Sequence, residues 1–213
     1  MERHEVEWAD GRFTTTRFIP ADGDIGVLLS HGAGSDQDHL LNAGIRDRLA
    51  DRGIPVMSFD YPYKAEGKGR PDRAEVLMSC HRALIDHAIA HMGRVVVAGR
   101  SMGGRIGTMV AVDAPVVGAV AYAYPLHPPG RQDRLRVEHL PEISVPVLMV
   151  IGSRDTFVTE ELYDEHVRGL PNVTTKVLEG ADHGWKVLKR SGRTQDEVFD
   201  EAVDTTVDWL GRI

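Results

Sequence analysis

The most informative chemical feature of the sequence is a serine inside a glycine-rich pentapeptide. Residues 99–103 read Gly-Arg-Ser-Met-Gly, which is the pattern Gly-x-Ser-x-Gly centred on Ser101. The pentapeptide follows a β-branched apolar run and precedes a helical pattern, and a turn this tight needs very small residues two positions before and after the serine. Both positions hold glycine. We therefore predict that Ser101 is a nucleophile. The alternative is a helix-capping serine whose glycines let the helix pack closely on the sheet.

A nucleophilic serine needs a histidine base and a carboxylate that orients the histidine, and in this setting the acid precedes the histidine along the chain. His183 stands in a loop after the last predicted strand, and Asp155 follows the end of the strand before it. Both would lie with Ser101 at the carboxyl edge of a parallel sheet. Asp155 could instead cap the helix that begins near Glu160. Asp182 is a rival acid, but a side chain adjacent in sequence to His183 is poorly placed to meet its ring.

A second glycine-rich turn, Ser-His-Gly-Ala-Gly-Ser at residues 30–35, follows the first buried strand. It suits half of an oxyanion hole, in which the backbone N–H groups of Ala33 and Met102 would receive the negative oxygen. The competing interpretation is a dinucleotide-binding turn, because residues 32–34 begin the pattern Gly-x-Gly-x-x-Gly and Asp60 ends the next strand, as a ribose-binding acid would. Gln37 occupies the third glycine position, which weakens that interpretation.

Three further side chains are candidates for substrate contact, and the sequence leaves each of them open. Arg100 adjoins the predicted nucleophile and could meet an anionic group of the substrate, or pair with a local carboxylate. His127 lies among prolines, at the mouth of the site or in a structural loop. Trp185 would wall the pocket or cover the edge of the sheet.

Histidines and the one cysteine give weaker signals. His87 and His91 are four residues apart on a predicted helix and could face one metal ion, but no glutamate accompanies them as in His-Glu-x-x-His. A solvated or half-buried helical pair is the favoured interpretation. Cys80 lies within the same helix with no base nearby, so we expect a packed thiol. The predicted chemistry needs no metal ion and no organic cofactor.

The elements that would position these residues alternate along the chain. Short apolar runs predict strands, and apolar residues at spacings of three and four predict helices. Strands are expected at 25–30, 54–59, 94–98, 116–123, 145–151 and 173–178, and helices at 38–52, at 73–91 and near the end of the chain up to 210. Crossovers of this length favour parallel pairing. The predicted fold class is a doubly wound, mostly parallel α/β sheet with helices on both faces.

Three segments complete this prediction. Residues 13–19 are expected to form an edge strand added before the main sheet, and residues 61–71, rich in Gly, Lys and Pro, a surface loop. Residues 124–144 separate two strands and contain four prolines, so they can hold a loop and one short helix but no cap domain. An open cleft with a preference for short acyl groups would follow.

Composition narrows the class of protein. The chain has 213 residues, 42% of them hydrophobic and 27% charged, which is the balance of one soluble globular domain over residues 1–213. Its 32 acidic residues outnumber 25 basic ones, for a net charge of −7, which argues against nucleic acid as the main partner. No apolar run of membrane-spanning length and no N-terminal signal segment is found, so a cytoplasmic protein without membrane contact is expected.

Together, these motifs resemble the α/β-hydrolase superfamily over about residues 20 to 210. More narrowly, the chain is similar to the small, lidless dienelactone-hydrolase-like group that includes the testis-expressed α/β-hydrolase-like proteins. The segment 124–128, Tyr-Pro-Leu-His-Pro, is similar to a segment of that group. The resemblance implies an α/β-hydrolase fold and a triad of Ser101, His183 and Asp155. Dienelactone hydrolases use a cysteine where this chain has Ser101, which argues against that particular activity.

We therefore expect a serine hydrolase of the carboxylesterase or thioesterase kind, which cleaves a small-molecule acyl substrate through an acyl-enzyme. The alternative from another class is a hydrolase-like binding or scaffold protein with a vestigial triad, and a dinucleotide-binding protein is a more distant one. A homodimer stays open, since nothing in the sequence decides the oligomeric state.

Overall fold

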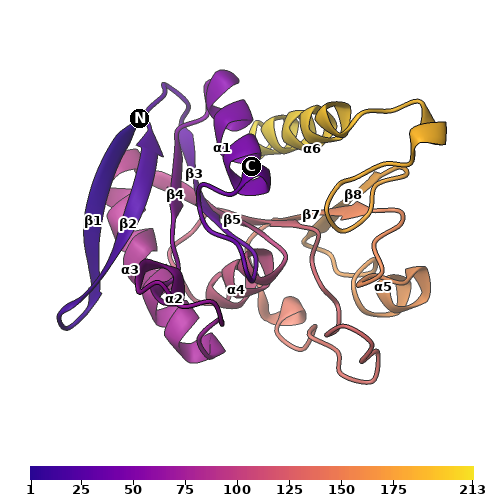
Figure 1. The fold of residues 1–213 in the computed structure, drawn as a ribbon, viewed down its shortest axis with the longest axis horizontal. Helices are drawn as coiled ribbons and strands as arrows, with labels where there is room; N and C mark the ends of the chain where they lie inside the picture. The colour runs from indigo at the N-terminus through magenta and orange to yellow at the C-terminus, as the bar shows by residue number, and fades with distance from the viewer.

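An eight-stranded sheet forms the centre of the molecule in the computed structural model, which describes residues 1–213 (Figure 1). The strands follow the order β1-β2-β4-β3-β5-β6-β7-β8. β3 to β8 pair in parallel, while β2 pairs antiparallel with both β1 and β4. Helices pack on both faces of the sheet. The predicted doubly wound, mostly parallel α/β fold is confirmed.

The element bounds lie close to the predicted ones. The strands are β1 (Glu2–Ala9), β2 (Arg12–Ile19), β3 (Ile25–Ser30), β4 (Val56–Phe59), β5 (Arg94–Arg100), β6 (Gly118–Tyr122), β7 (Val147–Gly152) and β8 (Val173–Leu178). The helices are α1 (Leu40–Asp51), α2 (Pro62–Ala65), α3 (Ala74–Met92), α4 (Met102–Val110), α5 (Glu160–His166) and α6 (Gln195–Leu210). Two short 3₁₀ helices, η1 (Leu140–Glu142) and η2 (Lys189–Ser191), complete the set.

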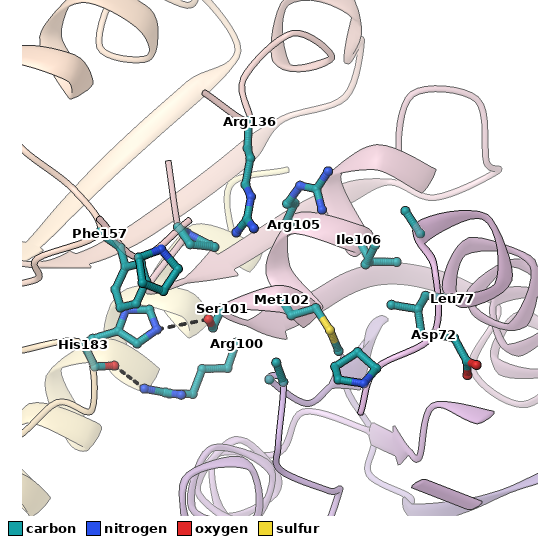
Figure 2. Close-up of a pocket in the computed structure, with 16 residues that line it drawn as sticks. Asp72, Leu77, Arg100, Ser101, Met102, Arg105, Ile106, Arg136, Phe157 and His183 are labelled. Atoms are coloured by element: carbon teal, nitrogen blue, oxygen red, sulfur yellow. Dashed lines mark hydrogen bonds between the residues drawn. The ribbon is translucent and has the colours of Figure 1, made fainter. Parts of the chain in front are cut away.

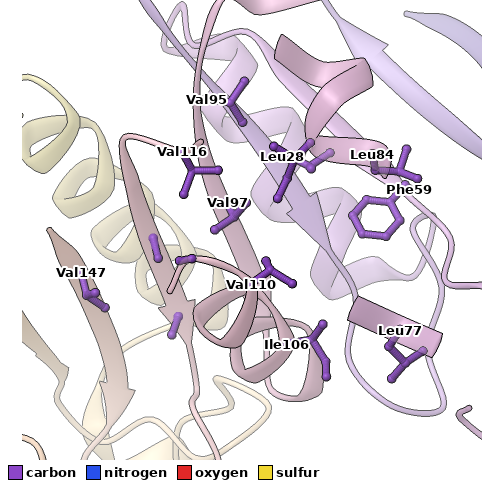
Figure 3. Close-up of a cluster of buried hydrophobic side chains, with 14 of the residues drawn as sticks. Leu28, Phe59, Leu77, Leu84, Val95, Val97, Ile106, Val110, Val116 and Val147 are labelled. Carbon is purple, nitrogen blue, oxygen red and sulfur yellow. The ribbon is translucent and has the colours of Figure 1, made fainter. Parts of the chain in front are cut away.

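The central strands are continuous apolar runs because both of their faces are covered. In β5, Val95 and Val97 belong to the apolar cluster that packs under α3 and α4, whereas Val96 and Ala98 belong to the cluster under α1 and α6. Figure 3 shows the cluster on the side of α3 and α4, in which Ile106 of α4 packs with Val95 and Val97 of β5. Side chains alternate between the two faces of a strand, so each cluster receives every second residue of β5.

Residues 13–19 are an inner strand, and the prediction of an edge strand there was wrong. β1 lies outside β2 and forms the edge of the sheet (Figure 1). Only Val6 and Trp8 of β1 are buried, and charged residues alternate with them toward solvent. An edge strand with few apolar residues gives no continuous run, which is why the sequence did not reveal it.

The segment 61–71 is a surface loop only in its second part, where residues 65–70 are exposed; its start differs from the prediction. It contains the short helix α2, and the side chains of Tyr61 and Tyr63 are fully buried. Their rings pack edge-on against the ring of His31, at centroid distances of 5.2 and 5.8 Å. The start of this segment therefore packs against the turn that follows β3 and stabilises it.

The region that would carry a cap domain is short. Between β6 and β7 the only helical element is η1, which has three residues. The expectation that no cap domain is present is thereby confirmed, because this segment has no room for inserted helices above the sheet. None of the helices combines the length and the apolarity that a bilayer crossing needs.

Candidate active site

Ser101 lies on a strained turn between β5 and α4. Its backbone has φ 53° and ψ −114°, a conformation that non-glycine residues rarely adopt. A Cβ on Gly103 would lie 2.7 Å from the carbonyl oxygens of both Ser30 and His31, and one on Gly99 would collide with Ser30 and Gly103. The Ser101 N–H donates to the carbonyl of Tyr122 at 2.8 Å, which ties the turn to β6. Glycine is thus required on both sides of the serine.

The structure brings Ser101, His183 and Asp155 into one hydrogen-bonded chain. Nε2 of His183 lies 3.0 Å from Oγ of Ser101 (Figure 2), and Nδ1 lies 2.7 Å from Oδ2 of Asp155. The side chain of Asp155 is buried, and its Oδ1 accepts the N–H of Phe157 at 2.9 Å. The ring of Phe157 packs on the imidazole with 4.4 Å between centroids. Asp155 and Phe157 therefore hold the imidazole in one orientation.

The rival acid, Asp182, has a different set of contacts. Its Oδ1 accepts the backbone N–H groups of Gly184 and Lys186 at 2.8 and 2.9 Å. These bonds close the turn that carries His183. Asp182 thus shapes this turn, and the carboxylate that contacts the imidazole belongs to Asp155.

Two residues at the cavity of Ser101, one from each glycine-rich turn, have unpaired backbone N–H groups. Ala33 and Met102 line the same cavity as Ser101, and neither N–H has a hydrogen-bond partner within the protein. Met102 is the first residue of α4, where N–H groups and the helix dipole favour negative charge. The arrangement has the parts of an oxyanion hole.

His31, which the sequence did not single out, supports the turn that carries Ala33. Burial lowers the pKa of His31, so its imidazole is neutral near pH 7. Nε2 accepts the N–H of Tyr61 at 3.0 Å, which leaves Nδ1–H to donate to the carbonyl of Gly32 at 2.8 Å. The neutral ring therefore links the turn after β3 to the segment after β4.

Asp60 is the residue that would bind a ribose in a dinucleotide site, but its carboxylate is hydrogen-bonded to Gln37. The backbone N–H and the side-chain amide of Gln37 donate to the two oxygens of Asp60, at 2.9 and 2.8 Å. Gln37 is fully buried, and neither residue lines the cavity at Ser101. These bonds leave the carboxylate engaged inside the protein, which disfavours the dinucleotide interpretation.

A cavity of about 500 Å³ opens at Ser101, and Arg100 is the one of the three substrate-contact candidates that reaches it. Arg100 donates to the carbonyl oxygen of His183, and burial lowers the pKa of this arginine to about 10 (Figure 2). His127 is 2% exposed, and its Nδ1 is bonded to the carbonyl of Pro128. Trp185 is fully buried between Tyr122 and Phe199. Neither His127 nor Trp185 lines this cavity.

Several lining residues had no role predicted from the sequence, and three of them have charged or aromatic side chains: Arg105, Arg136 and Phe157. Arg105 lies four residues after Ser101 on α4, which places both on one face of the helix, so its spacing was a usable signal. Arg136 and Phe157 come from loops without any periodic pattern, and only the fold brings them to the serine.

Comparison with known proteins adds the family context. A family model described as an alpha/beta hydrolase domain matches residues 23–211. The curated protein "Putative protein-lysine deacylase ABHD14B" of Rattus norvegicus is 28% identical over 166 residues, which cover 74% of this chain and 73% of that protein.

Two solved structures illustrate the similarity of the fold. An esterase from Pyrococcus furiosus is 18% identical, with a TM-score of 0.79 and coverage of 99% of this chain and 90% of that one. An α/β serine hydrolase without a lid, from Xanthomonas campestris, is 15% identical, with a TM-score of 0.74 and coverage of 98% and 94%. At these identities the structures establish a common fold.

Proposed function

The chain belongs to the α/β-hydrolase family, and from that premise we propose that it is a serine hydrolase that cleaves a small carboxylic ester or thioester. The observation that carries the proposal is the hydrogen-bonded chain from Ser101 Oγ through His183 to Asp155, at 3.0 and 2.7 Å. Both distances are those of a nucleophile, its base and an orienting acid. The cavity at the serine supplies room for a small ligand.

In the first half of the reaction, Nε2 of His183 takes the proton from Ser101 as Oγ attacks the acyl carbonyl. The carbonyl oxygen becomes negative and accepts hydrogen bonds from the backbone N–H groups of Ala33 and Met102. Collapse of this intermediate breaks the bond to the alcohol or thiol, which leaves with the proton that His183 returns. The acyl group stays on Ser101 as an ester.

In the second half, His183 takes a proton from a water molecule that attacks the acyl-enzyme. The same two N–H groups donate hydrogen bonds to the oxyanion of the second intermediate. His183 then returns the proton to Oγ of Ser101 as the carboxylic acid leaves. Asp155 keeps the Nδ1–H tautomer of His183 and stabilises the imidazolium in both halves.

Cleavage of an acyl-lysine amide is a second candidate. It is favoured by the similarity to the rat protein that bears the name of a putative protein-lysine deacylase. The same residues would act, with an amine as the leaving group that His183 must protonate. The competing proposal is a non-catalytic function: a binding protein whose triad is vestigial.

Labelling with a fluorophosphonate probe, read by intact mass, tests the proposal. We expect one adduct on the wild-type protein, none on Ser101→Ala, and an unchanged adduct on Ser79→Ala, which removes an exposed serine of α3. A folded wild-type protein that takes no label would favour the binding protein. Turnover of p-nitrophenyl acetate against an acetyl-lysine peptide then separates the ester and amide candidates.

A further inference from the structure

The cavity at Ser101 is unusually rich in positive charge for a protein of net charge −7. Arg100, Arg105 and Arg136 line it, against one carboxylate, Asp72. None of the three arginines forms an ion pair within the protein, whereas several arginines elsewhere in the chain do. Arg100 is engaged by the carbonyl oxygen of His183. Arg105 and Arg136 have no such partner for their guanidinium groups.

Arg105 and Arg136 lie together on one side of the serine. Figure 2 shows both above Ser101, with Arg136 extending toward it. The Arg105 N–H donates to the carbonyl of Ser101 at 3.0 Å, so its side chain starts one helical turn away, about 5.4 Å along the axis. Burial, and then the positive charge of Arg105, lower the pKa of Arg136. Two like charges so placed repel each other until an anion joins them.

The protein holds this pair in place without neutralising it. The Arg136 N–H donates to the carbonyl of Leu126 at 2.9 Å, and its own carbonyl accepts the hydroxyl of the buried Tyr124. Nε of Arg105 is buried and has no hydrogen-bond partner. His139 beside Arg105 has its pKa lowered to about 4, first by burial and then by the charge of Arg105, so this imidazole is neutral near pH 7 and adds no further positive charge.

We propose that Arg105 and Arg136 form a subsite for a carboxylate or phosphate group of the substrate, about one helical turn from the bond that Ser101 attacks. The inference rests on the proposed function, because it specifies the substrate class of the same site. A guanidinium presents a fork of donors that fits both anions, and desolvation strengthens the bonds. The substrate is therefore a small ester or thioester that carries an anionic group on its acyl part or on its leaving group.

Two pairs of esters test the subsite, one for each side of the scissile bond. Mono-p-nitrophenyl adipate against p-nitrophenyl hexanoate places the anion on the acyl side, and 4-carboxyphenyl butyrate against phenyl butyrate places it on the leaving group. In at least one pair, Arg136→Gln and Arg105→Gln should lower the anionic-to-neutral ratio of kcat/KM roughly 10- to 100-fold, the loss expected for hydrogen bonds to a charged group.

The matched control is Arg134→Gln, which removes an exposed arginine of the same loop and should keep the wild-type ratio. Hydrolysis with a ratio that neither lining variant changes in either pair would overturn the subsite and leave the serine hydrolase intact. If no ester is cleaved, the proposed function fails, and calorimetric titration with adipate and with inorganic phosphate still decides the subsite. Binding of either anion must then weaken in Arg136→Gln but not in Arg134→Gln.

A separate cluster of three histidines lies away from this cavity, where α3 packs on the edge of the sheet. His87 and His91 are joined by His4 of β1, and one nitrogen of each lies within 4.8 Å of the others. His4 Nδ1 is 3.0 Å from His87 Nε2. Nδ1 of His91 is bonded to the carbonyl of His87, which leaves Nε2 of His91 free. The sequence favoured a simple helical pair because β1 was not recognised.

We infer that these three imidazoles bind a divalent transition metal such as Zn²⁺ or Ni²⁺, for which neutral imidazole is a preferred ligand. A small movement of the three side chains toward one another would place one nitrogen of each about 2.0–2.1 Å from a zinc ion. The fourth coordination position would then be left for water. The metal would pin β1, which is the edge strand, to α3.

Calorimetric titration of EDTA-treated protein with ZnCl₂ and NiCl₂ at pH 7.5 tests this site. We expect one ion per chain, and at least a tenfold weaker affinity in His4→Ala and in His87→Ala, with no change in the control His166→Ala on α5. Absence of binding to the wild type would overturn the site. Full affinity in His4→Ala would also overturn it, because the helical pair alone would then suffice.

Discussion

Asp155 and Asp182 lie close to the same histidine, yet their carboxylates meet different groups. Oδ2 of Asp155 is 2.7 Å from Nδ1 of His183, and its other oxygen is held by a backbone N–H. Asp182 accepts two N–H groups of the turn that carries His183. The first contact governs the tautomer of the imidazole, and the second governs the shape of a turn.

At the residue scale, we therefore predict that Asp155→Asn lowers kcat by about 10⁴-fold, as in the serine-protease example of a triad acid replaced by an amide. An amide at this position favours the wrong tautomer of His183. Asp182→Asn should cost far less in kcat and should lower the melting temperature instead. The comparison uses kcat with a short p-nitrophenyl ester. A larger loss in Asp182→Asn than in Asp155→Asn would refute the assignment.

At the scale of elements, the turn between β5 and α4 depends on close backbone packing. The N-terminus of α4 approaches the ends of β3 and β5 so closely that a methyl group on Gly103 meets two carbonyl oxygens. Gly107 lies one turn further along the same helix, and a Cβ there would find its nearest neighbour, in the ring of His81, at 3.6 Å. Alanine at position 103 therefore tests the close packing of the backbone, whereas alanine at position 107 changes only the helix propensity.

We predict that Gly103→Ala abolishes fluorophosphonate labelling and destabilises the fold, because either α4 or β3 must move. Gly107→Ala is the matched control. It should keep the labelling and raise the free energy of unfolding by up to about 1 kcal/mol, the usual difference between alanine and glycine within a helix. Urea unfolding and probe labelling measure both effects. Normal labelling in Gly103→Ala would show that the turn tolerates displacement.

At the scale of the whole molecule, buried histidines make the fold sensitive to acid. His81 is fully buried, with Nδ1 bonded to the hydroxyl of Tyr61 at 3.1 Å, and burial lowers its pKa to about 3. The unfolded chain would protonate this imidazole near pH 6.5. As the pH falls below that value, the unfolded state binds a proton that the folded state excludes, so stability present above it is lost.

We therefore predict that His81→Gln, which can still bond the hydroxyl of Tyr61, reduces the loss of stability between pH 7 and pH 5 by about 2 kcal/mol. Urea unfolding at both pH values gives the difference. His166→Gln removes a partly exposed histidine and should show the wild-type pH dependence. An identical pH dependence in His81→Gln would mean that this imidazole titrates in the folded protein.

The absence of a cap domain shapes substrate preference at the same scale. A long acyl chain would find little apolar cover, and each CH₂ contributes about 0.8 kcal/mol only when it leaves water. We predict that kcat/KM for p-nitrophenyl esters is highest for short chains and falls toward palmitate, without activation at a lipid interface. A maximum at palmitate would require a cover from elsewhere, such as the segment 61–71 or a second copy of the chain.

The sequence by itself predicted the positions of the main strands along the chain, their mostly parallel pairing, and the residues that meet at their carboxyl ends. Buried parallel strands need continuous apolar runs, and the turn at Ser101 needs glycine at 99 and 103, so both leave local patterns. Because parallel strands end at one edge, the loops with Ser101, Asp155 and His183 had to lie together there. The sequence could also rank Asp155 above Asp182.

Only the tertiary structure decided which side chains surround these residues. It placed Trp185 and His127 outside the cavity, buried Tyr61, and brought Arg136 beside Arg105. It also added β1 at the edge of the sheet, and with it His4. Each of these contacts joins segments that are distant along the chain, through loops or through an edge strand with few apolar residues. Local patterns carry no record of such contacts, because packing of the complete sheet and its helices sets them.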